Sequence, residues 1–169
     1  MRKAFKTLTL CTVLSAQLAY AEDRFVLESA DFAEGQPLAL KHHLNGFGCE
    51  GDNISPALSW SGAPSETKSF AVTLYDPDAS SGSGWWHWSV YNIPADVTSL
   101  DTNAGSGAGL PASSSQGMTD FGTFGFAGAC PPPGEMHRYQ FHVHAISVEK
   151  IDIPENATPA MVEIGRAHV

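Results

Sequence analysis

Residues 73–93 read TLYDPDASSGSGWWHWSVYNI, and the rest of the chain is organised around them. An apolar run ends in an Asp-Pro-Asp turn that begins at Asp76, a Gly/Ser loop follows, and an aromatic run starts at Trp85. Two strand-like runs joined by a flexible loop have their facing ends at the same edge of a sheet. We therefore expect Asp76 and His87 to lie close together. A carboxylate beside an imidazole can be a catalytic pair, half of a metal site or an anion pocket.

Outward from this stretch, short runs separated by glycine and proline predict a mainly β fold, a sandwich of antiparallel sheets with few short helices. The expected strands cover residues 25–29, 38–44, 57–60, 69–75, 85–91 and 137–148. The expected helix is short, around 158–162. Residues 102–134 are rich in glycine and serine and lack periodicity, and a loop of this length is usually functional or mobile.

Alternation of apolar and polar residues marks the core-facing side of three expected strands. The apolar positions that share a face are Phe70, Val72 and Leu74 in the first run, Trp86, Trp88 and Val90 in the second, and Tyr139, Phe141 and Val143 in the third.

The first 21 residues have the pattern of a secretory signal peptide: a basic start, an apolar stretch over 7–16, and a small-x-small cleavage site at 19–21. The apolar stretch is too short to span a bilayer. We expect cleavage before Glu22, a single β domain over 22–162, and a periplasmic or secreted protein with no transmembrane segment in the mature chain.

The chain is acidic, with 9 basic and 18 acidic residues among 169. Cleavage of the signal would leave six basic residues against eighteen acidic ones, a net charge of −12. A surface this acidic disfavours nucleic acid and anionic lipid faces as partners. A small buried anion site remains compatible with it, because distant surface charges are screened by salt.

Two cysteines, Cys49 and Cys130, remain after the signal. Export to an oxidising compartment favours a disulfide between them. Two free thiols, or thiolate ligands to zinc, are the alternatives, and the wide spacing is weak support for zinc.

The last seven residues, EIGRAHV over 163–169, break the preceding pattern abruptly. They resemble the translation of a sequencing adapter. We interpret them as a non-native tail and set them aside from fold reasoning, with an ordinary short tail as the alternative.

Two motifs together resemble a known family. DPDA at 76–79, followed by GWWHW at 84–88, resembles the first signature of the phosphatidylethanolamine-binding protein family. GACPPPG at 128–134, followed by HRY at 137–139, resembles the second. The chain is most similar to the exported bacterial, Raf-kinase-inhibitor-like branch, whose members share the two cysteines.

This resemblance implies two antiparallel sheets packed face to face, with a small anion pocket at one end. It implies that a Cys49–Cys130 disulfide pins the pocket rim, and that the family's C-terminal helix and closing strand are truncated here. It implies no cofactor, no metal and no catalytic residue. The ligand-binding residues that it implies, with the walls and a backbone donor included, are Asp76, Pro77, Trp85, His87, Gly128, Pro131, His137 and Tyr139.

The residue types of this set suit a phosphate. Two imidazoles donate hydrogen bonds and carry positive charge when protonated, and Asp76 beside them would favour protonation. Backbone N–H groups around Gly128 would add donors in a concave turn. We therefore expect a non-enzymatic binding protein for a small anionic or phosphorylated ligand. A protein-interaction or inhibitor module with a vestigial pocket is the alternative, and a small hydrolase is a weaker one.

Other interpretations of single residues stay open beside this one. His87 and His137 could be structural histidines, and His142 with His144 could bind a metal, although a solvated strand face is the simpler interpretation. The tryptophans over 85–88 could stack on a sugar, although core and pocket wall are commoner roles. We expect His42 and His43 at the surface. The chain contains neither Gly-x-Ser-x-Gly nor His-Glu-x-x-His, which argues against a hydrolase.

Overall fold

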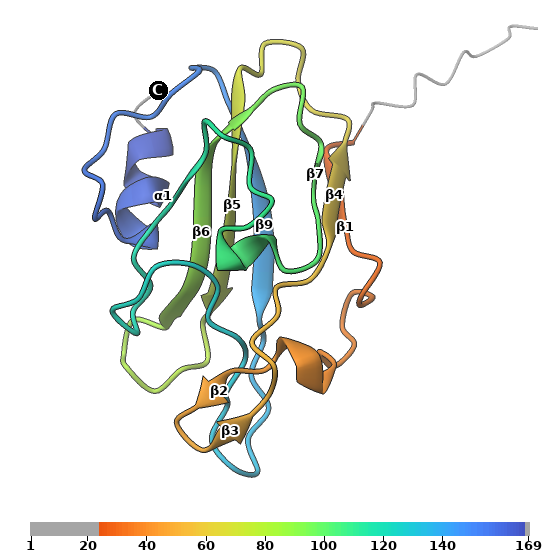
Figure 1. The fold of residues 1–169 in the computed structure, drawn as a ribbon, viewed down its shortest axis with the longest axis vertical. Helices are drawn as coiled ribbons and strands as arrows, with labels where there is room; N and C mark the ends of the chain where they lie inside the picture. The colour runs from red at the N-terminus through yellow and green to blue at the C-terminus, as the bar shows by residue number, and fades with distance from the viewer. Residues whose placement is uncertain (1–23, 168–169) are drawn as a thin grey trace, which may run out of the picture.

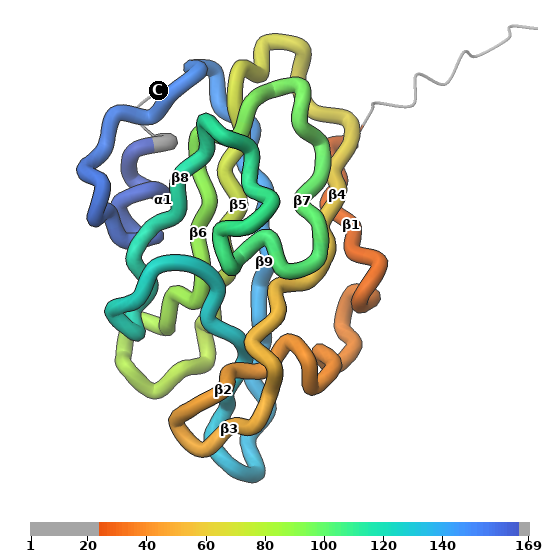
Figure 2. Tube along the Cα trace, viewed as in Figure 1, coloured from red at the N-terminus to blue at the C-terminus, as the bar shows by residue number. Residues whose placement is uncertain are grey.

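The computed structural model describes residues 24–167, and its centre is the hairpin of β5 (Ser69–Asp76) and β6 (Trp85–Pro94). A four-stranded antiparallel sheet in the order β8-β6-β5-β9 contains this hairpin, and a three-stranded sheet in the order β1-β4-β7 packs against it (Figures 1 and 2). A small hairpin, β2–β3, lies at one end. The remaining strands are β1 (Val26–Glu28), β2 (Asn45–Gly46), β3 (Cys49–Glu50), β4 (Leu58–Ser61), β7 (Ser99–Leu100), β8 (Ser115–Gln116) and β9 (Gln140–Ile146).

The main core lies between the two larger sheets. Trp60 of β4 meets Phe70 of β5 edge-on, with ring centroids 5.4 Å apart. The alternation expected in the sequence is confirmed for the central strands, since one buried cluster contains Phe70, Val72, Leu74, Trp88 and Val90. The mainly β sandwich is therefore confirmed.

The opposite face of the four-stranded sheet is also covered. Ala71 and Tyr91 pack there with Ile151 and with Val162 of α1 (Pro159–Ala167). Because both faces are covered, β5 is buried along nearly its whole length.

The helix α1 extends well beyond the expected 158–162 and runs to Ala167. The suspected tail thus supplies its second half, and Glu163 Oε1 lies 2.9 Å from His144 Nε2 of β9. The last two residues of that tail lie outside the described residues, and its foreign origin stays a prediction. The expected signal peptide, 1–21, also lies outside them. Within 24–167, no helix combines the length and apolarity needed to cross a bilayer.

The strand expected over 38–44 is wrong, because this segment forms a 3-10 helix, Leu40–His42. The surface position expected for His42 is also wrong: this side chain is fully buried, and its Nδ1 lies 2.6 Å from the carbonyl oxygen of Ile54. His43 is half-buried and forms a parallel bridge with Ala129. Both predictions failed because this segment packs against the distant second motif, and local periodicity does not encode such a contact.

The long loop over 102–134 is a packed layer that contains β8 and the 3-10 helix Ala104–Ser106. The backbone N–H of Gly105 donates to Ser55 Oγ at 2.8 Å, and the N–H of Ala127 donates to the carbonyl of His87 at 2.9 Å. The first bond fixes the loop to the segment before β4, and the second fixes it to β6 and places the residues that precede the second motif.

Candidate functional site

The DPD turn and the start of the second hairpin strand meet as expected. Asp76 is the last residue of β5 and pairs in register with Trp85, the first residue of β6. His87 follows two residues later on the same strand.

The second motif brings its histidine onto the same carboxylate. His137 Nδ1 lies 2.7 Å from Asp76 Oδ2, and both side chains are buried, with 7% and 3% of their surfaces exposed. The other oxygen of Asp76 accepts the backbone N–H of Asp78 at 2.9 Å, which fixes the carboxylate in its turn. Asp76 therefore orients the imidazole of His137, and the Nε2 of this ring is left for other contacts.

The two motifs are also joined by a second ion pair. Arg138 donates from Nε and from its terminal nitrogen to the two oxygens of Asp78, at 2.9 and 2.7 Å. The guanidinium holds the pKa of the Asp78 carboxyl well below its usual range. The two carboxylates of the DPD turn thus pair with two consecutive residues of the HRY segment, a link that opposite charges in the two motifs could have suggested.

The pKa values of the two imidazoles shift in opposite directions, whereas Asp76 was expected to favour protonation of both. The hydrogen bond with Asp76 raises the pKa of His137, against an opposing effect of burial, and Glu135 raises it further. Burial lowers the pKa of His87. Protonation is therefore favoured at His137 over His87.

His87 is held by backbone carbonyls. Its Nδ1 lies 2.9 Å from the carbonyl oxygen of Ala127 and 3.1 Å from that of Gly128. In the neutral ring the proton is therefore on Nδ1, which leaves Nε2 as a hydrogen-bond acceptor. The ring also packs edge-on against Tyr139, with centroids 5.2 Å apart.

Tyr139 completes the cluster. Its hydroxyl accepts the backbone N–H of Cys130 at 3.0 Å. Burial raises the pKa of Tyr139 to about 12. The phenol is therefore neutral at physiological pH and can donate its proton. Asp76, His87, His137 and Tyr139, expected from the resemblance, are brought together.

The backbone donors expected around Gly128 are used inside the protein. The N–H of Gly128 donates to Asn53 Oδ1 at 2.7 Å, and that of Ala129 donates to the carbonyl of His42 at 3.2 Å. Gly128 has a different role here, because a β-carbon at this position would collide with the backbone of residues 42–44. The glycine permits the close approach of the two segments.

The expected wall residues lie in two places. Pro131 lines the same groove as His137 and Tyr139. Trp85 packs edge-on against Phe121, which also packs against His87, with centroids 5.4 and 5.3 Å apart. Pro77 is the middle residue of the DPD turn. Phe121 was not predicted, because it lies in the long loop without periodicity.

Glu135 is the other residue that the sequence did not reveal. Its Oε2 lies 3.2 Å from His137 Nε2, and its side chain is 60% exposed. His137 thus lies between a buried carboxylate and an exposed one. An acidic residue two positions before the motif histidine was the available signal.

The disulfide between Cys49 and Cys130 is confirmed, with the two Cα atoms 5.8 Å apart. It ties the β2–β3 hairpin to the segment that supports the Tyr139 hydroxyl. Among the described residues, no three histidine, cysteine, aspartate or glutamate side chains are grouped so as to hold a metal ion.

A β-sandwich with an acid–imidazole–phenol cluster where two distant turns meet defines a class of binding protein. The family model described as phosphatidylethanolamine-binding protein matches residues 28–167, and the chain belongs to this family.

Bacterial relatives support the assignment. YbcL of Escherichia coli is 52% identical over 165 residues, which cover 93% of this chain and 88% of the relative. YbhB of the same organism is 53% identical over 137 residues, or 80% and 87% of the two chains. The crystal structure of YbcL, described as a new member of the mammalian family, matches with a TM-score of 0.82 over 85% of this chain and 90% of that one, at 52% identity. A homolog from Chlamydia trachomatis matches with a TM-score of 0.71 at 30% identity, over 85% and 88% of the two chains.

Proposed function

We propose that this protein is an exported, non-enzymatic binding protein that takes a small anion, such as phosphate or a phosphorylated head group, in the cluster of Asp76, His87, His137 and Tyr139, where His137 is the charged donor. The observation that carries the proposal is the geometry of His137. One ring nitrogen is fixed by a buried carboxylate, and the other lies 3.2 Å from an exposed carboxylate oxygen.

The contact with Glu135 indicates what His137 binds. A carboxylate oxygen resembles a phosphate oxygen in charge and in its capacity to accept hydrogen bonds. A free anion that takes the place of Glu135 would receive the same charge-assisted bond from Nε2. The neutral hydroxyl of Tyr139 is a second candidate donor.

Two members of the cluster are held by other parts of the protein, which suits a fixed binding site. The acceptor sites of Asp76 are used by the backbone of Asp78 and by His137, so this carboxylate orients the imidazole. The buried His87 is held on its Nδ1 side by two carbonyls.

The proposal of export rests on the signal-like pattern of residues 1–21. The mass of the mature protein from a periplasmic extract tests it, with Glu22 as the expected first residue.

Anion affinity is expected to fall as pH rises. The raised pKa of His137 keeps the ring charged below that pKa, and the charge is lost as pH rises through it. Calorimetric titration should therefore show tighter binding at pH 5.5 than at pH 8. Sulfate is measured beside phosphate, because its own charge is constant over this range. Equal or reversed affinities for sulfate at the two pH values would rule the site out.

A thermal-shift experiment separates a used pocket from a vestigial one. Phosphate and phosphoethanolamine should stabilise the wild type and lose this effect in His137→Ala, whereas a vestigial pocket would give no shift in either protein.

Replacing Glu135→Gln should strengthen phosphate binding about two- to fivefold, because the exposed carboxylate competes with the ligand for His137. A contact at this exposure is worth roughly 0.5–1 kcal/mol. The matched control is Glu66→Gln, which removes the same charge from an exposed position outside the site. Titration calorimetry at pH 6 measures both variants. Weaker binding in Glu135→Gln would show that this carboxylate supports the ligand and does not compete with it.

A further inference from the structure

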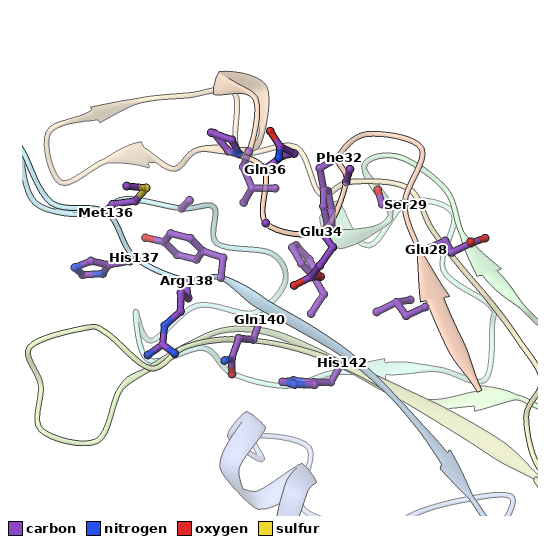
Figure 3. A pocket seen from close by; sticks show the side chains of 18 of the residues that line it. Glu28, Ser29, Phe32, Glu34, Gln36, Met136, His137, Arg138, Gln140 and His142 are labelled. Atoms are coloured by element: carbon purple, nitrogen blue, oxygen red, sulfur yellow. The ribbon is translucent and has the colours of Figure 1, made fainter. Parts of the chain in front are cut away.

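A groove of about 1270 Å³ runs between β1 and β9, on the side of the molecule away from α1 (Figure 3). Residues 26–29 line one side of it, and residues 137–142 line the other. Consecutive residues of a strand point to opposite faces of the sheet. Because residues 26–28 of β1 and residues 140–142 of β9 line the groove without a gap, it follows the edges of these parts of the two strands, and residues 32–38 complete its lining.

Both strands end their sheets. In the part of the chain that the structure describes, β9 is the terminal strand of the order β8-β6-β5-β9, and β1 is the terminal strand of the order β1-β4-β7. A terminal strand presents backbone N–H and C=O groups that have no neighbouring strand. β9 is the longer edge, with seven residues against three.

The groove has an apolar floor. Phe32 stacks on Phe141 with ring centroids 5.2 Å apart, and Leu27 and Tyr139 lie beside them, all four only half-buried. Alternate side chains of an added strand would cover this surface.

The rim is acidic. Glu28, Glu34 and Glu135 line the groove and are exposed, as the side chains of the first two show in Figure 3. The guanidinium of Arg138 also lines it, but its charge is balanced by Asp78 at 2.7 Å. The remaining titratable groups are Tyr139 and three histidines, His43, His137 and His142, of which His137 pairs with Glu135 at 3.2 Å. Glu28 and Glu34 are therefore the acidic groups of the rim that favour a cationic partner.

We propose that the free edge of β9 is a docking site for an extended, basic peptide segment of another protein, which adds to the four-stranded sheet as a fifth strand. Main-chain hydrogen bonds to β9 supply the affinity, the apolar floor takes alternate side chains, and the glutamates of the rim select lysine or arginine. This site shares Pro131, Glu135, His137 and Tyr139 with the surroundings of the anion cluster, but it does not include Asp76 or His87, so the two proposals can fail separately.

The probe is a peptide of seven residues, the length of β9, in which lysine and valine alternate. In an added strand, the N–H groups of alternate residues point toward β9. N-methylation of the lysines and N-methylation of the valines therefore differ in effect. We expect one of the two methylated peptides to bind like the parent and the other to lose at least tenfold in affinity, measured by titration calorimetry. Amides of Gln140–Ile146 should gain protection from hydrogen exchange.

Charge reversal tests the rim. Glu28→Lys with Glu34→Lys should weaken binding of the parent peptide about tenfold or more. The control pair, Glu66→Lys with Glu149→Lys, changes the net charge equally at exposed positions outside the groove and should have a much smaller effect. The proposal is overturned if the parent peptide does not bind, if both methylated peptides bind alike, if protection appears away from β9, or if the two charge-reversed pairs weaken binding equally. Neither charge-reversed pair includes an anion-site residue, so phosphate binding measured on the same samples reports separately on that site.

Discussion

Loss of the Cys49–Cys130 disulfide should lower the free energy of unfolding by about 4–5 kcal/mol, according to the chain-entropy account of a cross-link. The two cysteines are 81 positions apart, so the bridge removes much of the conformational freedom of the unfolded chain. Loss of the bridge should also destabilise the native state around Tyr139, because the N–H of Cys130 donates to the hydroxyl of that residue. Urea unfolding with and without a reducing agent measures the effect.

The double variant Cys49→Ala with Cys130→Ala is the matched control, because its unfolding midpoint should be low and insensitive to the reducing agent. An oxidised wild type whose midpoint equals that of the reduced protein would contradict the expected contribution of the bridge.

The second large effect is expected at Trp88, the largest of the fully buried side chains. Its ring packs edge-on against Phe126 at 5.6 Å, and its indole N–H donates to Gln116 at 2.6 Å. Trp88→Ala removes this ring from the core and leaves both a cavity and an unpaired amide oxygen. Truncations of this kind cost roughly 3–5 kcal/mol, which urea unfolding would measure.

Two further variants make the result interpretable. Trp88→Phe keeps part of the ring volume, so its unfolding midpoint in urea should lie between those of the wild type and Trp88→Ala. It replaces the alanine variant in the measurement if that variant does not fold. Trp86→Ala removes a half-buried ring that contacts Tyr75 and should cost only about 1–2 kcal/mol. A cost at Trp86 equal to that at Trp88 would mean that the two positions are not distinguished by burial. The burial of Trp88 also assigns it to the core and leaves Trp85 and Trp86 as the partly exposed members of the cluster.

The prediction of the fold succeeded where the signal was local. Phe70, Val72 and Leu74 alternate with smaller residues, and a strand converts that alternation directly into a buried face. The segment over 38–44 shows where this reasoning fails. Its apolar and histidine residues suggested a strand, but contacts with residues 128–129 convert it into a 3-10 helix with His42 buried.

The sequence allowed the meeting of the cluster residues to be predicted, but not the details of their chemistry. Asp76 and His137 are 61 positions apart, yet both belong to recognisable motifs, so their meeting could be anticipated. The opposite shifts in the pKa of His87 and His137 could not be anticipated, because they depend on how deeply each ring is buried and on which groups touch it.

The sequence by itself determined the β-rich class, the core-facing sides of the central strands and the pair of cysteines, because alternation and composition carry this information within a few residues. Only the tertiary structure decided that the N–H groups around Gly128 are used internally and that two sheet edges enclose a groove. Each of these features depends on the approach of segments that are distant in the chain, and the free energy of such contacts is set by geometry that no local pattern encodes.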